Sequence, residues 1–291
     1  MKKSLLIHSG PLLAVVLWGN SFIATKYLVV QLKPVTIISM RLILAIFLLL
    51  IIAVIQRRNF RINLRSHSYI LLLAVIAVFH LWIQVTGLKY TSASNTGWII
   101  GTAPIFIALL GFIFFKEKLS FINMAGVLIA TLGVLLLISK GDFVSLDFLK
   151  NIGDYLVLFS SFTWGVYSIV NKKISVTYSP LMTILYLFIF MAVIILPFNI
   201  NRETIDSIYN LNMTGWISIL YLGLLCSGIA YVLWAQSLSR MESAKVGAYL
   251  YFEPFVTVIG AWLILNESIT TNALLGGIII TAGVVLVNRE S

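Results

Sequence analysis

The sequence has little of the chemistry that most enzymes and metal proteins use. It contains one cysteine and three histidines in 291 residues. Cys226 lies inside an apolar run, so the chain offers neither a disulfide framework nor a cysteine-based metal cluster. It has no H-E-x-x-H, no G-x-S-x-G, no paired aspartates within an apolar run and no two histidines at ligand spacing. These absences argue against an enzyme and predict no metal and no other cofactor.

Charged residues are also scarce, at 10% of the chain, whereas hydrophobic residues make up 60% and the mean hydropathy is +1.03. A soluble domain of this size has too little interior to bury so much apolar surface, so lipid must be part of the solvent. Acidic residues are the rarer kind, which leaves a net charge of +10. Because the basic residues sit in short connections rather than on one face, this charge does not indicate a nucleic-acid partner.

The apolar runs are long enough to cross a bilayer as helices, which takes about 20 residues each. The predicted spans are residues 11–32, 34–55, 69–88, 93–115, 121–139, 152–174, 180–199, 214–237, 244–265 and 269–287. Pro34 and Pro180 are expected to open helices, because the first turn tolerates a missing N–H. The N-terminal Met1-Lys2-Lys3 segment lacks a cleavage-like exit, so we interpret the first run as a retained span. The sequence therefore predicts an all-α membrane protein with ten transmembrane helices.

An internal repeat divides these spans into two copies. The stretch Ser92–Ile122 returns as Glu242–Thr271, at a constant offset of 150 residues. The matches at this offset are Gly97 with Gly247, Pro104 with Pro254, Glu117 with Glu267, Gly126 with Gly276 and Gly133 with Gly283; at an offset of 146, Trp18-Gly19 matches Trp164-Gly165, Lys26 matches Lys172, and Pro34 matches Pro180. The predicted repeats are residues 1–145 and 146–291. Matched lysines and glutamates are expected to be architectural, with the glutamates capping or bracing the next helix and the lysines reaching past helix ends.

Each repeat holds five spans, an odd number, so the second copy is expected to enter the membrane inverted. Charge supports this orientation, since a cytoplasmic N-terminus leaves thirteen basic residues in the inner connections and five in the outer ones. The inner set is Lys2, Lys3, Arg57, Arg58, Arg61, Arg65, Lys116, Lys118, Lys172, Lys173, Arg240, Lys245 and Arg289; the outer set is Lys33, Lys89, Lys140, Lys150 and Arg202. We therefore expect both termini on the cytoplasmic side of the cell (inner or plasma) membrane.

Two inverted halves can exchange conformations and expose a site between them to each side in turn, which is the architecture of many secondary transporters. The sequence also resembles the drug/metabolite transporter superfamily, specifically its EamA type. The resemblance rests on the WG pairs, on the Arg41 region, on the proline followed by a glutamate in spans four and nine, and on the glycines of spans five and ten. It implies a ten-helix transporter that exports amino acids, related metabolites or toxic compounds, often linked to protons.

Polar and aromatic side chains within the spans are the candidate substrate site, because such groups normally face protein or a water-filled cavity. The candidates are Trp18, Asn20, Ser21, Arg41, His80, Gln84, Asn95, Trp98, Trp164, Tyr167, Tyr231, Trp234 and Tyr249, with Glu253 as the proton-coupling candidate. Aromatic walls suit solutes with apolar or cationic parts. For Trp18 and Trp164, packing between helices explains the residues equally well, and His80 is better explained as a hydrogen-bonded interior residue than as a proton shuttle.

Glu253 and Arg41 are charges without a repeat counterpart, since Ala103 and Leu187 occupy the matching positions. A mid-span carboxylate must be paired or protonated, so Glu253 could carry a proton, or it could serve the backbone groups freed by Pro254. Arg41 could receive a substrate carboxylate through a bidentate contact, hold helix ends together, or pair with Glu253.

The sequence as a whole predicts a secondary transporter of small organic metabolites, with amino acids or related compounds as the expected class and export as the expected direction. The expected partners of the protein are a small-molecule substrate, the lipid bilayer and a candidate proton. The sequence makes no prediction of oligomeric state. A channel or structural membrane subunit is the alternative, followed by a membrane-embedded enzyme. Flux separates the three, because a transporter saturates and shows counterflow.

Overall fold

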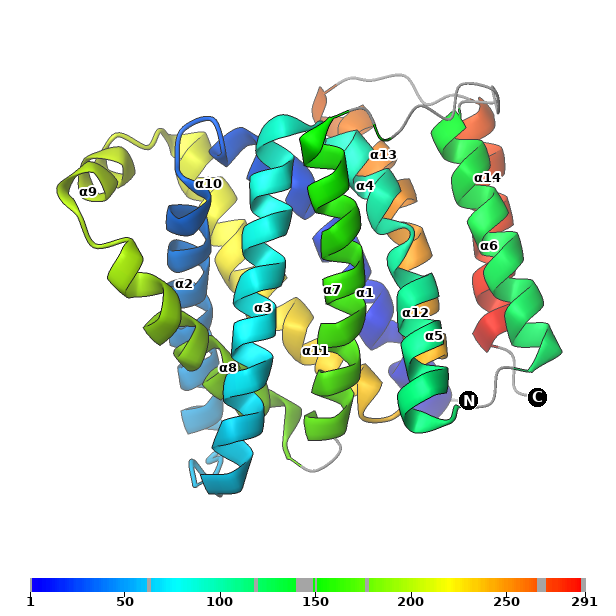
Figure 1. Ribbon diagram of the computed structural model, residues 1–291, viewed down its shortest axis with the longest axis horizontal. Coiled ribbons are helices and arrows are strands. Elements are labelled where there is room, and N and C mark those ends of the chain that lie inside the picture. Colours follow the sequence, from blue (N-terminus) through cyan, green and yellow to red (C-terminus); the bar gives the residue numbers. More distant parts are fainter. Residues whose placement is uncertain are drawn as a thin grey trace.

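The computed structural model describes residues 2–61, 64–117, 120–139, 149, 151–175, 178–265 and 271–288, and within these ranges it contains helices and no strand. Most of the helices run alongside one another, with α6 and α14 at one edge of the bundle and α9 at the other (Figure 1). The α-helices are α1 Lys2–Leu28, α2 Pro34–Ile55, α3 Leu64–Tyr90, α4 Ala93–Ile100, α5 Ala103–Phe115, α6 Phe121–Ser139, α7 Ile152–Ser175, α8 Pro180–Ile195, α9 Arg202–Tyr209, α10 Met213–Leu220, α11 Ala230–Leu238, α12 Ser243–Ala248, α13 Phe252–Leu265 and α14 Thr271–Asn288. Shorter pieces of other helix types are η2 Leu196–Phe198, η3 Tyr221–Ile229 and η4 Tyr249–Tyr251.

Two predicted spans are interrupted next to a proline. The expected helix 93–115 consists of α4 and α5, which are separated just before Pro104, and 244–265 consists of α12, η4 and α13, whose first turn contains Pro254. A proline has no N–H to donate, and its ring crowds the preceding turn. Thr102 Oγ1 donates to the carbonyl of Ile99 at 2.7 Å and so satisfies one acceptor at the break. Both predicted spans therefore contain a local break, and Ala93–Phe115 is still a single apolar segment long enough to cross a membrane.

Other boundaries follow local chemistry. Pro34 and Pro180 open α2 and α8, which confirms that prediction. The first helix covers Lys2–Leu28 rather than 11–32 and carries Pro11 inside it. The short helix α9 was not predicted, because it is polar and the prediction followed apolar runs; Asn201 caps it by accepting from Thr204 N at 2.9 Å.

Five helical segments are long and apolar enough to cross a membrane: Pro34–Ile55, His67–Tyr90, Ala93–Phe115, Pro180–Phe198 and Met213–Leu238. Shorter apolar helices cover Phe121–Leu136 and Leu275–Asn288. Large apolar side chains also face outward, as in Phe47 and Leu128, which are each 63% exposed. A surface of this kind is suited to lipid and not to water.

Helices α6 and α14 pack closely because each presents glycine to the other. A Cβ atom on Gly126 would lie 2.8 Å from the carbonyl oxygen of Gly283, and one on Gly133 would lie 2.9 Å from that of Gly276. Real Cβ atoms do not come so near a backbone oxygen, so these positions admit only glycine unless the helices separate. Small residues at helix contacts are typical of packing in membranes.

Candidate functional site

A polar cavity lies between α1, α2, α3, α4, α7, α11, η4 and α13. Its lining residues are Trp18, Ser21, Phe22, Thr25, Arg41, His80, Leu81, Gln84, Ile100, Trp164, Tyr231, Leu250 and Glu253. The cavity volume is about 40 Å³, which is room for about three water molecules, since one needs roughly 10–15 Å³ on this scale. Both predicted repeats contribute lining residues.

Helical spacing accounts for the lining on α1 and α3. Ser21 and Thr25 follow Trp18 at the i+3 and i+7 positions, and Gln84 follows His80 at i+4, so each set shares one helix face. The structure turns both faces toward the cavity. The sequence therefore located these residues correctly relative to one another.

Five aromatic rings, here called the aromatic layer, form one wall of the cavity and the packing behind it: Trp18, Trp164, Tyr167, Tyr231 and Trp234. Trp18 meets Trp164 edge-on with centroids 5.0 Å apart, and Trp164 stacks on Tyr167 at 4.8 Å. All five are buried, and Tyr167 and Trp234 lie behind the lining residues. Trp18 and Trp164 pack on each other and also line the cavity, and their contact with a substrate stays a prediction.

Hydrogen bonds fix the orientation of the polar groups in the cavity. Arg41 Nε donates to Ser227 Oγ at 2.8 Å. His80 Nδ1 lies 3.0 Å from the carbonyl oxygen of Ser160, so this nitrogen carries a proton and donates it to that carbonyl. The Oε2 atom of Glu253 is buried with no hydrogen-bond partner in the part of the chain that the structure describes.

Six candidate residues lie outside the cavity lining: Tyr167 and Trp234 lie behind it, and the other four have different surroundings. Asn20 donates to Val16 O within α1 at 3.2 Å, and Asn95 donates to Asp154 Oδ1 at 2.6 Å. Trp98 packs against the cluster that contains Tyr251, and the hydroxyl of Tyr249 lies 2.6 Å from His8 Nδ1. The helix-face argument placed these residues beside the cavity residues, whereas the structure gives each of them another neighbour.

The two ends of the bundle are marked by repeat-matched lysines. Asp154 and Lys172 lie on α7, 18 residues and thus about 27 Å apart. At the first end, here the Lys26 end, Lys26 Nζ donates to Thr91 O at 2.6 Å, and Thr91 Oγ1 donates to Asp154. At the second, the Lys172 end, Lys172 Nζ donates to Met241 O at 2.9 Å.

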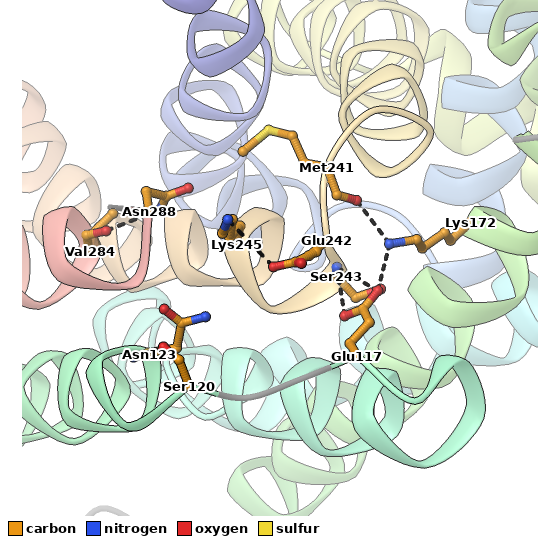
Figure 2. Close-up of polar contacts among 10 residues, drawn as sticks. All are labelled: Glu117, Ser120, Asn123, Lys172, Met241, Glu242, Ser243, Lys245, Val284 and Asn288. Atoms are coloured by element: carbon orange, nitrogen blue, oxygen red, sulfur yellow. Dashed lines mark hydrogen bonds and ion pairs between the residues drawn. The ribbon is translucent and has the colours of Figure 1, made fainter. Parts of the chain in front are cut away.

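The Lys172 end also contains a buried ion pair, which Figure 2 shows. Lys172 Nζ lies 2.6 Å from Glu117 Oε1, and the two side chains are only 14% and 9% exposed. Glu117 also accepts from Ser243 N, at 2.9 Å to Oε2, at the start of α12. We expected Glu117 to cap or brace the next helix, which is α6, but its contacts join the end of α5 to α7 and to the start of α12. Its counterpart Glu267 lies outside the described residues.

The cavity reaches toward the Lys26 end. Its lining on α1 begins at Trp18 and continues through Thr25, the residue before Lys26, and nothing before Trp18 takes part. Toward the Lys172 end it stops at Trp164 and Tyr231, behind which Tyr167 and Trp234 are fully buried. The aromatic layer therefore separates the cavity from the Glu117–Lys172 ion pair.

The candidate list missed the apolar lining residues Phe22, Leu81, Ile100 and Leu250. Apolar residues are everywhere in such a chain, so no sequence signal distinguishes these from lipid-facing ones. Ser243 was missed because its partner Glu117 is 126 residues away.

Comparison with known proteins covers the whole length of the chain. The model of the EamA-like transporter family matches residues 5–139 and 151–289. An uncharacterized transporter of Archaeoglobus fulgidus is 31% identical over 279 residues, 96% of each chain. A probable amino-acid metabolite efflux pump of Escherichia coli is 28% identical over 281 residues, which cover 94% of this chain and 91% of the relative. A protein of known crystal structure shares the fold, with a TM-score of 0.71, 14% identity and coverage of 94% of this chain and 96% of that chain.

Proposed function

Because the chain belongs to the EamA-like transporter family and is a multi-pass membrane protein, we propose that it is a secondary transporter of small organic metabolites that works by alternating access. Amino acids or related compounds are the proposed class and export is the proposed direction. The observation that carries the proposal is the polar cavity between the two repeats, which is closed toward one end by the aromatic layer and the Glu117–Lys172 ion pair. The name of the Escherichia coli relative, a probable amino-acid metabolite efflux pump, supports the substrate class.

The proposed architecture is ten membrane spans in two inverted repeats, residues 1–145 and 146–291. Reciprocal glycine contacts support it. A Cβ on Gly97 would lie 3.1 Å from Thr257 Oγ1, and one on Gly247 would lie 3.0 Å from Ile107 Cγ2; Thr257 and Ile107 are themselves 150 residues apart. Two more pairs of contacts match in the same way. The contact of Gly19 with Val256 corresponds to that of Gly165 with Phe106, and the contact of Gly126 with Gly283 corresponds to that of Gly133 with Gly276. A pseudo-two-fold axis exchanges both members of each contact at once.

The proposed location is the cell membrane, with both termini on the cytoplasmic side. The start of α1 and the end of α14 lie at the same end of the bundle, which is also the end where α7 finishes (Figure 1). This Lys172 end carries Arg57, Arg58 and Arg240, in keeping with the positive-inside rule. In this orientation the cavity reaches toward the outside, and the ion pair closes the cytoplasmic side.

Glu253 is proposed to carry the coupling proton. It is 3% exposed and lines the cavity from α13. A carboxylate without a protein partner at this depth is costly in the charged form, so protonation stabilises it when the cavity holds no cation. Taking up a proton and releasing it in the other conformation would link substrate flux to a proton gradient.

Counterflow in proteoliposomes tests the proposal. Vesicles loaded with an unlabelled amino acid are expected to accumulate the same labelled amino acid transiently, with saturation at high concentration. A channel would give linear flux without accumulation, and it remains the second candidate because it shares the cavity. Absence of saturable exchange with any metabolite in a broad panel would refute transport.

A further inference from the structure

The cavity contains one basic and one acidic side chain that do not pair with each other. Arg41 enters from α2 and Glu253 from α13, and they are 4% and 3% exposed. The structure records ion pairs elsewhere, yet none joins these two side chains, both of which are described. Burying separate charges costs free energy unless a ligand completes them. A cavity with separate basic and acidic groups is complementary to a ligand that carries separate anionic and cationic groups.

The arginine is oriented for this task. Its Nε donates to Ser227 Oγ at 2.8 Å, and this is the single hydrogen bond that the described residues give it. The two Nη atoms, which form the fork that suits a carboxylate, therefore remain for the cavity. Ser227 belongs to η3, which packs against α2, so the contact also fixes the direction of the guanidinium.

The glutamate is held on a rigid support. The hydroxyl of Thr257 lies 2.8 Å from Gly19 O and 2.9 Å from Glu253 O, and its one proton lies between these two acceptors, which links α1 to the first turn of α13. A Cβ on Gly19 would lie 3.1 Å from Glu253 O and 2.8 Å from Val256 Cβ, so the two helices pack too closely here for a side chain at position 19. The backbone at Glu253 is fixed while its Oε2 stays buried and unpartnered.

The charges also give the cavity a direction. The positions that match Arg41 and Glu253 in the other repeat are Leu187 and Ala103. The proposed two-fold therefore does not duplicate the charges, and the cavity has one cationic and one anionic side. Its volume of about 40 Å³ suits a small head group with a few heavy atoms, given the roughly 10–15 Å³ that one water needs.

We propose that Arg41 and Glu253 form a clamp for the zwitterionic head group of a free α-amino acid, in which Arg41 binds the carboxylate and Glu253 binds the ammonium group. This inference rests on the proposed function and adds the chemical requirement for recognition. A substrate must present both charges, because an analogue that lacks one of them forgoes the contact with Arg41 or the contact with Glu253. The clamp thus makes Arg41 and Glu253 the residues that determine specificity.

The test compares L-alanine with two analogues, L-alaninamide, which lacks the carboxylate, and propanoate, which lacks the ammonium group. Each competes with labelled L-alanine for counterflow in proteoliposomes, and L-phenylalanine with its amide and 3-phenylpropanoate forms a second series. The wild type is expected to prefer each parent amino acid by about tenfold or more, the usual effect of losing one charge-assisted bond.

The variants give each residue its own signature. Arg41→Gln should lower affinity for the parent and bring the parent-to-amide ratio close to one, while the preference over propanoate persists. Glu253→Gln should also lower affinity for the parent, but it should bring the parent-to-propanoate ratio close to one, while the preference over the amide persists. A merely structural role would lower all ligands together. Arg58→Gln and Glu203→Gln are matched controls that remove exposed charges outside the cavity, and should leave both ratios unchanged.

The outcomes separate the clamp from the proposed function. Saturable exchange of amines, amides or carboxylates as good as that of the parent amino acids would overturn the clamp and leave transport in place. Equal loss of all ligands in both variants would overturn it as well. Absence of exchange with every metabolite tested would overturn the proposed function and the clamp together. If a glutamine variant does not fold, Arg41→Lys and Glu253→Asp must still change one ratio more than the other.

Discussion

The two ends of the bundle have matched backbone contacts and different side-chain chemistry. At both ends a repeat-matched lysine donates to a carbonyl at equivalent positions, from Lys26 to Thr91 O and from Lys172 to Met241 O. At the Lys172 end a carboxylate joins the lysine and pulls α5, α7 and α12 together. At the Lys26 end, within the described residues, the lysine has backbone carbonyls as its partners.

Under the proposed mechanism, this difference would close the cavity toward one end and leave it accessible from the other. The lysine-to-carbonyl contacts occur at both ends and so do not distinguish them. The extra ion pair is local and reversible, so it can differ between conformations without disturbing the helices. A transporter needs such an element, since coupling between two sides requires two arrangements whose equilibrium a ligand can bias.

The largest expected effect comes from breaking the closed end. Removing one partner of a buried ion pair usually costs about 3 kcal/mol or more, so Lys172→Gln should open the Lys172 end. The reporter is Ser168→Cys in a Cys226→Ser background, because Ser168 is buried behind the aromatic layer, next to Trp234. Alkylation from the Lys172 side should accelerate by about tenfold or more. Lys26→Gln is the matched control, and equal acceleration in both would remove the distinction between the ends.

The second effect concerns access of protons from the Lys26 end. Glu253→Gln should leave the protein folded and abolish acceleration of transport by a pH gradient, because glutamine cannot release a proton. Uptake into proteoliposomes, with and without an imposed gradient, measures this. Glu203→Gln, an exposed glutamate at the Lys26 end, should retain the response. Unchanged gradient dependence in Glu253→Gln would remove Glu253 from the coupling role.

A smaller effect should follow from altering the wall between cavity and closed end. Trp164→Phe keeps an aromatic ring but removes an indole N–H that has no partner among the described residues. It should change the relative affinities for amino acids with different side chains by about threefold to tenfold with little loss of folded yield. Trp98→Phe serves as the control because Trp98 lies outside the cavity lining. A shift in preference with Trp98→Phe alone would indicate that the cavity is elsewhere.

The smallest expected effect comes from a second lysine–glutamate ion pair, which is exposed to water. Lys33 and Glu203 lie 2.7 Å apart at the Lys26 end but are 62% and 70% exposed. Exposed pairs of this kind contribute at most about 1 kcal/mol, so Glu203→Gln should barely shift the melting temperature. Glu117→Gln, at nearly the same N–O distance but buried, should shift it clearly downward. Similar shifts in melting temperature for the two variants would show that the buried ion pair stabilises the protein no more than the exposed one.

The sequence predicted the features that depend on helical periodicity and on hydrophobic composition. Apolar runs located most of the long helices, and helical spacing grouped Trp18 with Ser21 and His80 with Gln84. It failed where a contact joins distant segments. Asn95 and Trp98 share a face of α4, yet Asn95 bonds to Asp154 and Trp98 packs near Tyr251. The contact from Glu117 to Ser243 depends on how α5 meets α12, and helical periodicity carries no information about that meeting.

A single cysteine in the cavity reports whether the cavity opens to the two sides of the membrane in turn. Gln84→Cys in a Cys226→Ser background is labelled with an impermeant thiol reagent from each face of sealed, oriented vesicles. If exposure alternates, the cysteine should be labelled from the Lys26 face while the Glu117–Lys172 ion pair is intact. Adding Lys172→Gln should transfer its reactivity to the Lys172 face. Equal labelling from both faces with the ion pair intact, or labelling from the Lys26 face alone in both proteins, would contradict alternating exposure.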